Sequence, residues 1–254
     1  MQIRTGEVGI RVIQPSFSTV YYNNVDSNMQ NIESNQTLDE LAIMFGTDKS
    51  SRHHNYTRIY EDEFHGLRQK TRGLIEIGIG GQTYKGTAGS SLRMWSKYFA
   101  NAHVVGVDVD PTTEADYGER VHVVIGDQTH RSTLDKAVTL VPSVDIIIDD
   151  GSHQNNLTIA TFEYLFQYLR PGGVYVIEDT LCSGERQFNN VRGEMENFVM
   201  SIVRNIETNG RVLTKRNSSD FKKIDPDFVM NIYEKWVDSL TIYRGLYFIK
   251  KRSR

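Results

Sequence analysis

The sequence contains almost no cysteine and has no large excess of either charge. Cys182 is the single cysteine among 254 residues, which excludes an intramolecular disulfide and any zinc or iron–sulfur site built from cysteines. One thiol also agrees with a reducing compartment. The 29 Lys and Arg residues against 32 Asp and Glu residues leave a net charge of −3, so electrostatics gives no reason to expect nucleic acid as a partner.

Long apolar runs are missing as well. The longest runs, such as residues 146–148, have the length of a strand and fall far short of the roughly 20 residues that cross a bilayer. Residues 1–20 lack the basic stretch followed by an apolar stretch that marks a secretory signal. These absences predict a cytoplasmic protein without a membrane partner.

The overall composition is that of a globular protein. Hydrophobic residues make up 39% and charged residues 24%, which excludes a disordered chain, a collagen-like chain and a coiled-coil rod. Residues 1–36 are rich in Asn, Ser, Gln and Val and show no helical period, so we interpret them as an N-terminal arm. The arm is either loose and polar or packs on a second subunit of a homo-oligomer. Residues 37–254 are predicted to form one domain.

From residue 73 onward, short apolar stretches alternate with helical ones. Parallel strands need crossover helices, so this alternation predicts a doubly wound α/β fold with a mostly parallel, Rossmann-like sheet. Two further β-like runs flank Arg244 and Gly245, which predicts a hairpin, a seven-stranded sheet and one antiparallel terminal strand. The expected strands are residues 74–77, 104–107, 121–125, 144–148, 174–177, 240–243 and 246–249.

Helices are expected between and before these strands. Thr37 stands three residues ahead of Glu40, the spacing of a capping box, and Gly46 is placed to end that first helix. The other expected helices are residues 57–70, 91–99, 132–140, 154–169 and 191–208.

In an open α/β sheet, ligands bind beyond the carboxyl ends of the strands, and here those ends are rich in acids. Their mutual repulsion is costly unless a cation or a hydrogen-bonding ligand is present, so this edge is the candidate site. The acids are Asp108, Asp127, Asp149, Asp150, Glu178 and Asp179.

The glycine-rich turn at residues 76–81 follows the first strand. It lacks the full G-x-G-x-x-G pattern of dinucleotide sites and comes closer to the E-x-G-x-G loop that holds the amino-acid end of S-adenosylmethionine. Asp108 could accept both ribose hydroxyls, and Asp127 and Gln128 would lie near the adenine. Each residue alone could equally be a solvated loop residue, but their order along the chain favours the cofactor.

A second group of residues predicts a metal and a base. Neighbouring strand ends lie about 5 Å apart, so Asp150, Glu178 and Asp179 can converge on one point. Carboxylate oxygens without cysteine suit Mg²⁺. His153 opens the following helix and could take a proton from a hydroxyl. The alternative is that His153 is a structural residue bonded to a nearby carboxylate.

Three residues of suggestive type are given no role. Cys182 has no evident partner base and is interpreted as a bystander near the site. His53 and His54 are adjacent in a polar loop, where histidines are usually exposed.

Together these motifs resemble those of the metal-dependent, class I S-adenosylmethionine methyltransferases that O-methylate sugars of macrolides and other glycosylated natural products. The resemblance covers about residues 37–185, and its most specific parts are Asp-Asp-Gly-Ser-His and Ile-Glu-Asp. The matching stretches are residues 45–49, 54–57, 74–81, 91–95, 126–128, 148–153 and 170–179.

The resemblance implies a role for each group. Mg²⁺ would be bound by Asp150, Glu178 and Asp179, and His153 would act as general base. Asp149 would orient the methyl end of the cofactor or support the site. The substrate would be a small glycoside or sugar. The residues implied to hold S-adenosylmethionine are Glu76, Gly78, Gly80, Ser91, Asp108, Asp127, Gln128, Asp149, Lys49, Tyr56 and Thr57.

The resemblance stops short of the oligomer and the acceptor. The macrolide enzyme carries a large N-terminal auxiliary domain that shapes both, and only residues 1–36 could correspond to it here. Neither property is therefore expected to transfer.

Three rival functions remain open at this stage. A metal-dependent methyltransferase of catechol-like acceptors also uses adjacent hydroxyls, and the sequence does not separate it from a sugar methyltransferase. A nicotinamide-dependent oxidoreductase uses a similar sheet, but the only Tyr-x-x-x-Lys spacing, Tyr247 to Lys251, falls on a terminal strand. A non-catalytic binding module would not need the acids or His153.

Overall fold

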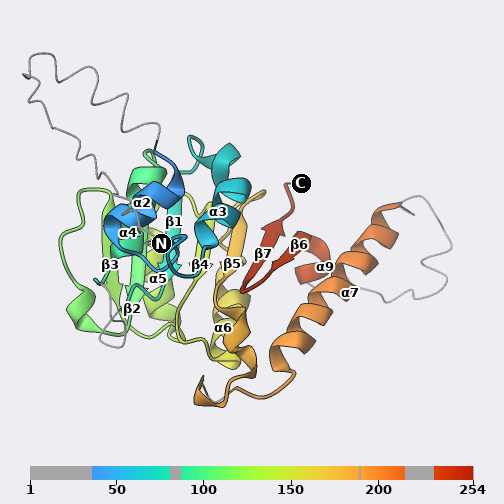
Figure 1. The fold of residues 1–254 in the computed structure, drawn as a ribbon. Coiled ribbons are helices and arrows are strands. Elements are labelled where there is room, and N and C mark those ends of the chain that lie inside the picture. Colours follow the sequence, from blue (N-terminus) through green and yellow to red (C-terminus); the bar gives the residue numbers. More distant parts are fainter. Residues whose placement is uncertain (1–35, 81–86, 189, 215–231, 254) are drawn as a thin grey trace, which may run out of the picture. The chain divides into compact units, whose positions relative to one another are not determined.

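The computed structural model describes residues 36–80, 87–188, 190–214 and 232–253 (Figure 1). Contacts along the backbone divide the chain into two units, residues 1–36 and 37–254. The predicted arm, apart from Gln36, lies outside the described residues, so its role stays a prediction.

The second unit is built on a seven-stranded sheet of order β3-β2-β1-β4-β5-β7-β6. Among the described strands, β7 alone runs antiparallel to its neighbours, β5 and β6, which confirms the predicted doubly wound fold with one antiparallel terminal strand. The strands are β1 (Gly73–Ile77), β2 (His103–Asp108), β3 (Val121–Ile125), β4 (Ile146–Asp149), β5 (Val174–Ile177), β6 (Val237–Tyr243) and β7 (Leu246–Lys251).

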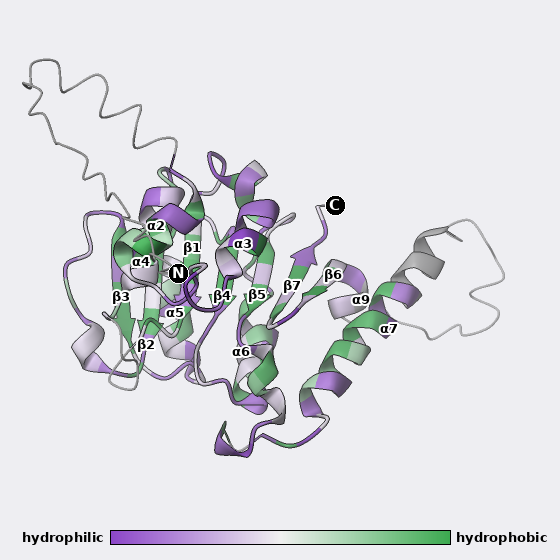
Figure 2. Ribbon diagram, viewed as in Figure 1, coloured by the Kyte–Doolittle hydropathy of each residue, from purple (hydrophilic) through white to green (hydrophobic). Residues whose placement is uncertain are grey.

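The sheet separates two apolar cores because side chains alternate between its faces. On β4, Ile146 and Ile148 join one core and Ile147 joins the other. Helices α2 (Leu38–Phe45), α3 (Tyr56–Phe64) and α4 (Ser90–Tyr98) cover the first face. Helices α5 (Arg131–Thr139), α6 (Asn155–Leu165) and α7 (Glu194–Thr214) cover the second, and Figure 2 shows apolar residues along the strands between them. A short helix, α9 (Ile232–Trp236), leads into β6.

The helix signals of the sequence are largely present in the structure. The capping box at Thr37 and Glu40 is formed, and Gly46 ends α2 in a left-handed conformation with φ 75°. The second helix is shorter than predicted, because α3 gives way after Phe64 to a 3₁₀ turn, η1 (His65–Leu67), that contains the weak helix former Gly66. Helix α7 begins at Glu194 because Gly193 has φ 84°.

Four short 3₁₀ turns lie in the connections of the described part of the chain. Besides η1 these are η2 (Pro111–Thr113), η3 (Thr180–Gly184) and η4 (Arg186–Phe188), and the last two follow β5 beside the candidate site. Within the described residues, no helix combines the length and the apolar character that crossing a bilayer requires.

Candidate active site

The carboxyl ends of β1, β4 and β5 stand level with one another. Ile77 pairs with Asp149, and Asp149 pairs with Ile177. The ladder continues one residue further, because Asp150 N donates to Ile77 O at 2.8 Å and Glu178 N donates to Asp149 O at 2.9 Å. Asp149, Asp150 and Glu178 therefore lie at adjacent positions of one edge of the sheet.

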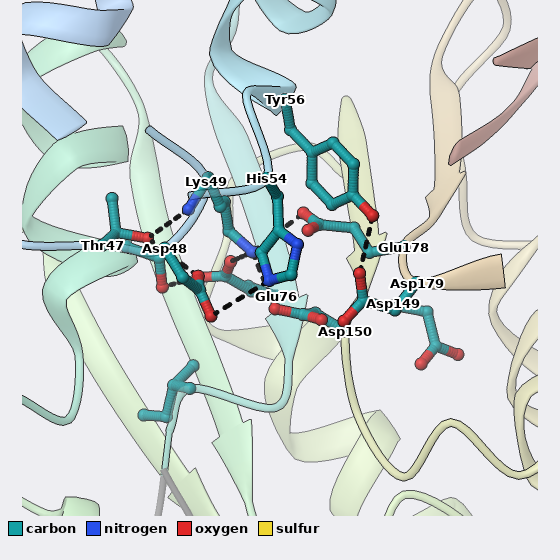
Figure 3. A network of polar contacts seen from close by, with 12 residues as sticks. Thr47, Asp48, Lys49, His54, Tyr56, Glu76, Asp149, Asp150, Glu178 and Asp179 are labelled. Carbon is teal, nitrogen blue, oxygen red and sulfur yellow. Dashed lines mark hydrogen bonds and ion pairs between the residues drawn. The ribbon is translucent and has the colours of Figure 1, made fainter. Parts of the chain in front are cut away.

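Lys49 lies inside this group of acids (Figure 3). Its Nζ is 2.7 Å from Asp150 Oδ2, 2.9 Å from Glu178 Oε1 and 3.5 Å from Glu76 Oε1. The lysine is 1% exposed, and Tyr60 Oη donates to the same Glu178 oxygen at 2.6 Å. One buried ammonium thus contacts three carboxylates, of which Glu76 and Glu178 are almost fully buried and Asp150 is partly exposed.

Asp179 and His153 form the more open side of the cluster. His153 Nε2 lies 3.7 Å from Asp179 Oδ2, and both side chains are 21% exposed. Tyr56 Oη donates to Asp179 Oδ1 at 2.7 Å. The ring of Phe188 packs edge to face against the His153 imidazole, with 5.4 Å between the ring centroids.

Backbone strain is concentrated in the same place. Within the described residues, the non-glycine positions with positive φ are Asn55 (56°), His153 (55°) and Asp179 (51°). A left-handed conformation costs a residue with a Cβ about 1–2 kcal/mol, so the surrounding contacts must hold it. Such outliers cluster at functional sites, which supports this edge as the candidate active site.

Two groups of side chains in the described part of the chain could hold a metal ion, and they share Asp150. The first is Asp150, His153 and Asp179, and the second is Glu76, Asp150 and Glu178. The predicted set of Asp150, Glu178 and Asp179 is thus divided between them. The ammonium of Lys49 lies within the second group, so the first is the more open to an ion from solution.

The donor set of the open group fits Mg²⁺. Asp150 and Asp179 supply hard oxygens on side chains that are 21% exposed. Mg²⁺ is usually held by one or two carboxylates and keeps waters or substrate oxygens in its other positions. Glu178 belongs to the other group, and its Oε1 already accepts from Tyr60 and Lys49, so its part in binding the ion stays a prediction.

Burial changes the acidity of these groups. It raises the pKa of the Asp149 carboxyl to about 7, although hydrogen bonds from Gly151 N and the Tyr175 hydroxyl act in the opposite direction. Burial also raises the pKa of the Asp150 and Glu178 carboxyls, against the opposing effect of the Lys49 charge. The fold therefore holds these acids together at a cost in free energy, which a cation would offset.

A small cavity adjoins the cluster on the side of β1. It measures about 40 Å³, room for one small polar group, and five predicted residues lie on its wall. Gly78 and Gly80 have φ of 80° and 82°, and a Cβ on Gly78 would lie 2.1 Å from Asp150 O, so glycine is required there. The predicted residues on the wall are Lys49, Gly78, Gly80, Ser91 and Asp150.

Asp108 connects the glycine turn to the end of β2. Its Oδ2 accepts from Ile79 N at 2.9 Å and its Oδ1 accepts from Asp110 N at 2.9 Å. A carboxylate has about four lone-pair positions, so both oxygens retain capacity for two ribose hydroxyls. The predicted contact of Asp108 with the ribose stays a prediction.

The two predicted adenine residues form hydrogen bonds within the chain. Asp127 Oδ1 accepts from the backbone N and the hydroxyl of Thr129, both at 2.7 Å, and the first of these bonds is the main cause of the lowered pKa of Asp127. Gln128 is 7% exposed, donates to Thr161 Oγ1 at 3.0 Å and accepts from Ser152 N at 3.0 Å. Gln128 thus joins the loops after β3 and β4, and its contact with adenine stays a prediction.

Three further cofactor candidates bind other side chains of the chain. Glu76 is fully buried and accepts from Ser91 Oγ at 2.6 Å and Trp95 Nε1 at 3.2 Å. Thr57 is 1% exposed and donates to Asp39 Oδ1 at 2.7 Å. These bonds place Glu76 and Thr57 behind the surface that a ligand would touch, while Ser91 also reaches the small cavity.

Asp149 is likewise buried and supports the loop beyond β4. It accepts from Tyr175 Oη at 3.1 Å and from Gly151 N at 3.3 Å. Of the two roles that the sequence allows for Asp149, this geometry favours support of the site.

Sequence reasoning missed several residues that shape the site. Tyr60 and Tyr175 occupy positions with core spacing, so their hydroxyl bonds to Glu178 and Asp149 had no separate signal. Asn190 donates to His153 O at 3.0 Å and to Cys182 O at 2.8 Å, and accepts from Asn155 N at 2.7 Å. Asn190 lies 37 positions from His153, a distance at which no local pattern predicts a contact.

Within the described part of the chain, the structure gives no catalytic contact to Cys182 or His54, two of the residues to which the sequence assigns no role. Burial raises the pKa of the Cys182 thiol to about 11, which disfavours the reactive thiolate. His54 has a side chain that is 47% exposed and stacks on Tyr56.

A larger cavity of about 410 Å³ lies between α5 and α6, and Gln128 is the one predicted site residue on its wall.

Comparison with known proteins agrees with this geometry. Residues 75–180 match the family model described as a methyltransferase domain. A 2'-O-methyltransferase of 8-demethyl-8-alpha-L-rhamnosyl tetracenomycin-C from Streptomyces olivaceus is 40% identical over 147 residues, which are 58% of this chain and 38% of that protein. Mycinamicin VI 2''-O-methyltransferase from Micromonospora griseorubida is 37% identical over 142 residues, 56% of this chain and 35% of that protein.

A solved structure is also similar. The MycE methyltransferase of the mycinamycin biosynthetic pathway, in complex with Mg and SAH, has a TM-score of 0.73 and 28% identity over 85% of this chain and 55% of that one. The chain thus spans less than two fifths of the two curated relatives and about half of this structure. The resemblance inferred from the motifs is confirmed: the chain has the class I methyltransferase fold, and its relatives include sugar O-methyltransferases.

Proposed function

We propose that this chain is an S-adenosylmethionine-dependent O-methyltransferase that acts on a hydroxyl of a glycosylated small molecule, with Mg²⁺ and a histidine base. The observation that carries the proposal is the convergence of Asp150, His153 and Asp179 beside a small polar cavity below the glycine turn. A base, a set of hard oxygens and a cofactor pocket are the parts that such a reaction requires.

The chain's own residues would divide the work as follows. Gly78, Gly80 and Ser91 receive the amino-acid end of the methyl donor, and Asp108 receives the ribose. Asp150 and Asp179, with Glu178 behind them, hold Mg²⁺, which when bound lowers the pKa of a coordinated hydroxyl and fixes its orientation. His153 Nε2 takes the proton of the acceptor hydroxyl as its oxygen bonds to the methyl carbon and the carbon–sulfur bond breaks.

The class of acceptor follows from the relatives rather than from the site alone. The relatives' names specify sugar positions of rhamnosyl tetracenomycin-C and mycinamicin VI. Adjacent hydroxyls on a sugar suit the open metal group, but a catechol presents the same pair. A panel of vicinal-diol glycosides and catechols, assayed with the same methyl donor, distinguishes these acceptors.

The homo-oligomeric state and the cytoplasmic location belong to this proposal as well.

The test uses variants of the base and the shared carboxylate. His153→Ala is expected to reduce turnover at least about 100-fold, and Asp150→Ala to abolish it, while S-adenosylhomocysteine still raises the melting temperature. His53→Ala is the matched control, because that histidine of the same loop is exposed and lies outside both metal groups. Full activity in excess chelator, or in either site variant, would refute the scheme. A melting shift with NAD in place of S-adenosylhomocysteine would point to the oxidoreductase.

A further inference from the structure

Lys49 is buried among the acids of the site, a position that the local sequence does not predict. Lys49 belongs to the polar loop between α2 and α3, where lysines are normally solvated. Its backbone is fixed in this loop, because Thr57 N donates to Lys49 O at 3.0 Å and Lys49 N donates to Thr47 Oγ1 at 3.4 Å. The side chain is therefore delivered to the acids by an ordered segment.

The ammonium meets one acid from each of three neighbouring strand ends. Glu76 belongs to β1, Asp150 follows β4 and Glu178 follows β5. The three distances of 2.7, 2.9 and 3.5 Å give the ammonium an acid partner on each side. An ammonium group has three N–H donors, so its capacity matches this arrangement.

This group is also one of the two that could hold a metal ion. Its carboxylate oxygens lie within 4.8 Å of one another, as do the ligand atoms of the open group. The lysine thus stands where a second cation would otherwise be bound. Three ionised carboxylates around a single ammonium leave a net negative charge, and Asp150 is the most exposed of the three.

We propose that Lys49 is a positioning residue, a built-in cation that holds Asp150 and Glu178 together before any metal arrives and confines the divalent ion to the side of Asp150, His153 and Asp179. The metal part of this inference rests on the proposed function. The lysine part rests on the contacts alone. Lys49 would then position the metal-binding carboxylates without touching the ion, in addition to any contact with the cofactor across the small cavity.

The charge of Lys49 is maintained by its surroundings. Carboxylate oxygens at 2.7, 2.9 and 3.5 Å favour the charged form of a buried amine. Removing the ammonium would leave three carboxylates facing one another, two of them almost fully buried, which is strongly unfavourable. The affinity of these carboxylates for a divalent ion would then increase.

The test compares Lys49→Met with Lys136→Met, an exposed lysine on α5 that lies outside both metal groups. In chelator, Lys49→Met is expected to melt about 10 °C below the unsubstituted protein, and Lys136→Met within about 2 °C of it. In millimolar Mg²⁺, Lys49→Met should recover more than half of its loss. Mn²⁺ counted by electron paramagnetic resonance should bind at least about tenfold tighter to Lys49→Met, or in a second equivalent, because the carboxylates have lost their competitor.

If Lys49→Met does not fold in chelator, the double variant Lys49→Met/Glu76→Gln keeps the test open. Glu76→Gln removes one of the facing charges and retains an acceptor for Ser91, so the double variant should regain stability that Lys49→Met lacks. An equal melting temperature of Lys49→Met and the unsubstituted protein in chelator would overturn the inference. So would a loss that neither Mg²⁺ nor Glu76→Gln reduces.

These readouts need neither methyl donor nor acceptor, so their failure is distinct from failure of the proposed reaction. A protein that binds S-adenosylhomocysteine and methylates a glycoside, yet shows unchanged Mn²⁺ affinity in Lys49→Met, would retain the function and lose the inference.

Discussion

The two ends of the parallel strands carry acids in opposite circumstances. Asp145, immediately before β4, is 3% exposed and accepts from the backbone N–H groups of Arg72 and Gly73 at 2.7 and 2.9 Å. It also forms an ion pair with Arg170. At the carboxyl ends, three carboxylates share the single ammonium of Lys49.

The difference shows where the fold gives up stability. At the amino ends the acid has donors on both oxygens and fastens the start of β1 to the start of β4. At the carboxyl ends the charge is left incompletely balanced, and the pKa of Glu178 is raised well above its usual value by burial, despite Lys49. Uncompensated charge of this kind is what a cation-binding site needs and what a structural site avoids.

The same change of acid to amide at the two ends should therefore have opposite results. Asp145→Asn turns an NH₂ group toward donors and should lower the free energy of unfolding by about 2 kcal/mol, or roughly 4–8 °C in melting temperature. Glu178→Gln removes a charge that burial disfavours and should leave the melting temperature equal or higher, while turnover falls. Thermal melts and methyl-transfer assays of both variants check this. Equal destabilisation by the two changes would contradict the comparison.

Much of the carboxyl-end arrangement could be predicted from the sequence. Each acid follows a short apolar strand directly, and parallel strands bring their ends to one edge, so the position of Asp150 beside Glu178 follows from topology alone. The capping box at Thr37 and the hairpin at Gly245 are local patterns of the same kind. Patterns of this kind depend on neighbours in sequence.

The remaining features of the site depend on the directions of individual side chains, which no hydrophobic period in the sequence predicts. Nothing local indicates that Lys49 enters the acid cluster or that Gln128 turns inward to Thr161, because a loop residue has no preferred face. Tyr60 has the spacing of a core residue and is one, yet its hydroxyl also reaches Glu178. The division of the predicted metal ligands into two groups depends on the distances between their side-chain ligand atoms, and so it needed the structure.

The next test disturbs the carboxyl-end site from outside, through the β6–β7 turn. Gly245 has φ 84°, and a Cβ there would lie 2.4 Å from Tyr56 Oη, the group that donates to Asp179. Gly245→Ala should therefore cost about 2 kcal/mol in stability and reduce turnover about tenfold, since Asp179 loses its partner.

Gly118→Ala is the control for the backbone effect alone. Gly118 has φ 105°, and a Cβ at this position would have no neighbour within 4 Å, so the variant should lose about 1 kcal/mol of stability and no activity. Equal turnover in the two glycine variants would show that Tyr56 does not position Asp179.

A smaller effect is expected from the amide that holds the base. Asn190 donates to His153 O and Cys182 O and so secures the left-handed conformation of His153. Asn190→Ala should reduce kcat about tenfold with an unchanged affinity for S-adenosylhomocysteine, and lower stability by about 1 kcal/mol. Asn101→Ala, which removes an exposed amide that donates to Gln69 O, is the control. A rise in KM without a fall in kcat would indicate a binding role instead.

The smallest effect concerns pH and an acid of the helical layer. Glu61 accepts from Leu38 N at 3.0 Å and from Tyr98 Oη at 3.1 Å. Burial alone would raise the pKa of its carboxyl, but these bonds, together with His65, outweigh burial and lower it from the usual 4.5. Because the folded-state pKa is the lower one, the stabilisation by Glu61 is present above pH 4.5 and is lost as the pH falls through the folded-state pKa.

Melting curves of the unsubstituted protein and Glu61→Gln from about pH 7 to about pH 3 measure this contribution. Their difference should be constant above about pH 5 and shrink below about pH 4.5, since the variant carboxamide does not titrate. Glu178→Gln should show the opposite slope, because burial raises the pKa of Glu178 and its charged form is the unfavourable one. Parallel curves for the two variants would mean that scaffold acids and site acids do not differ in the way their contacts indicate.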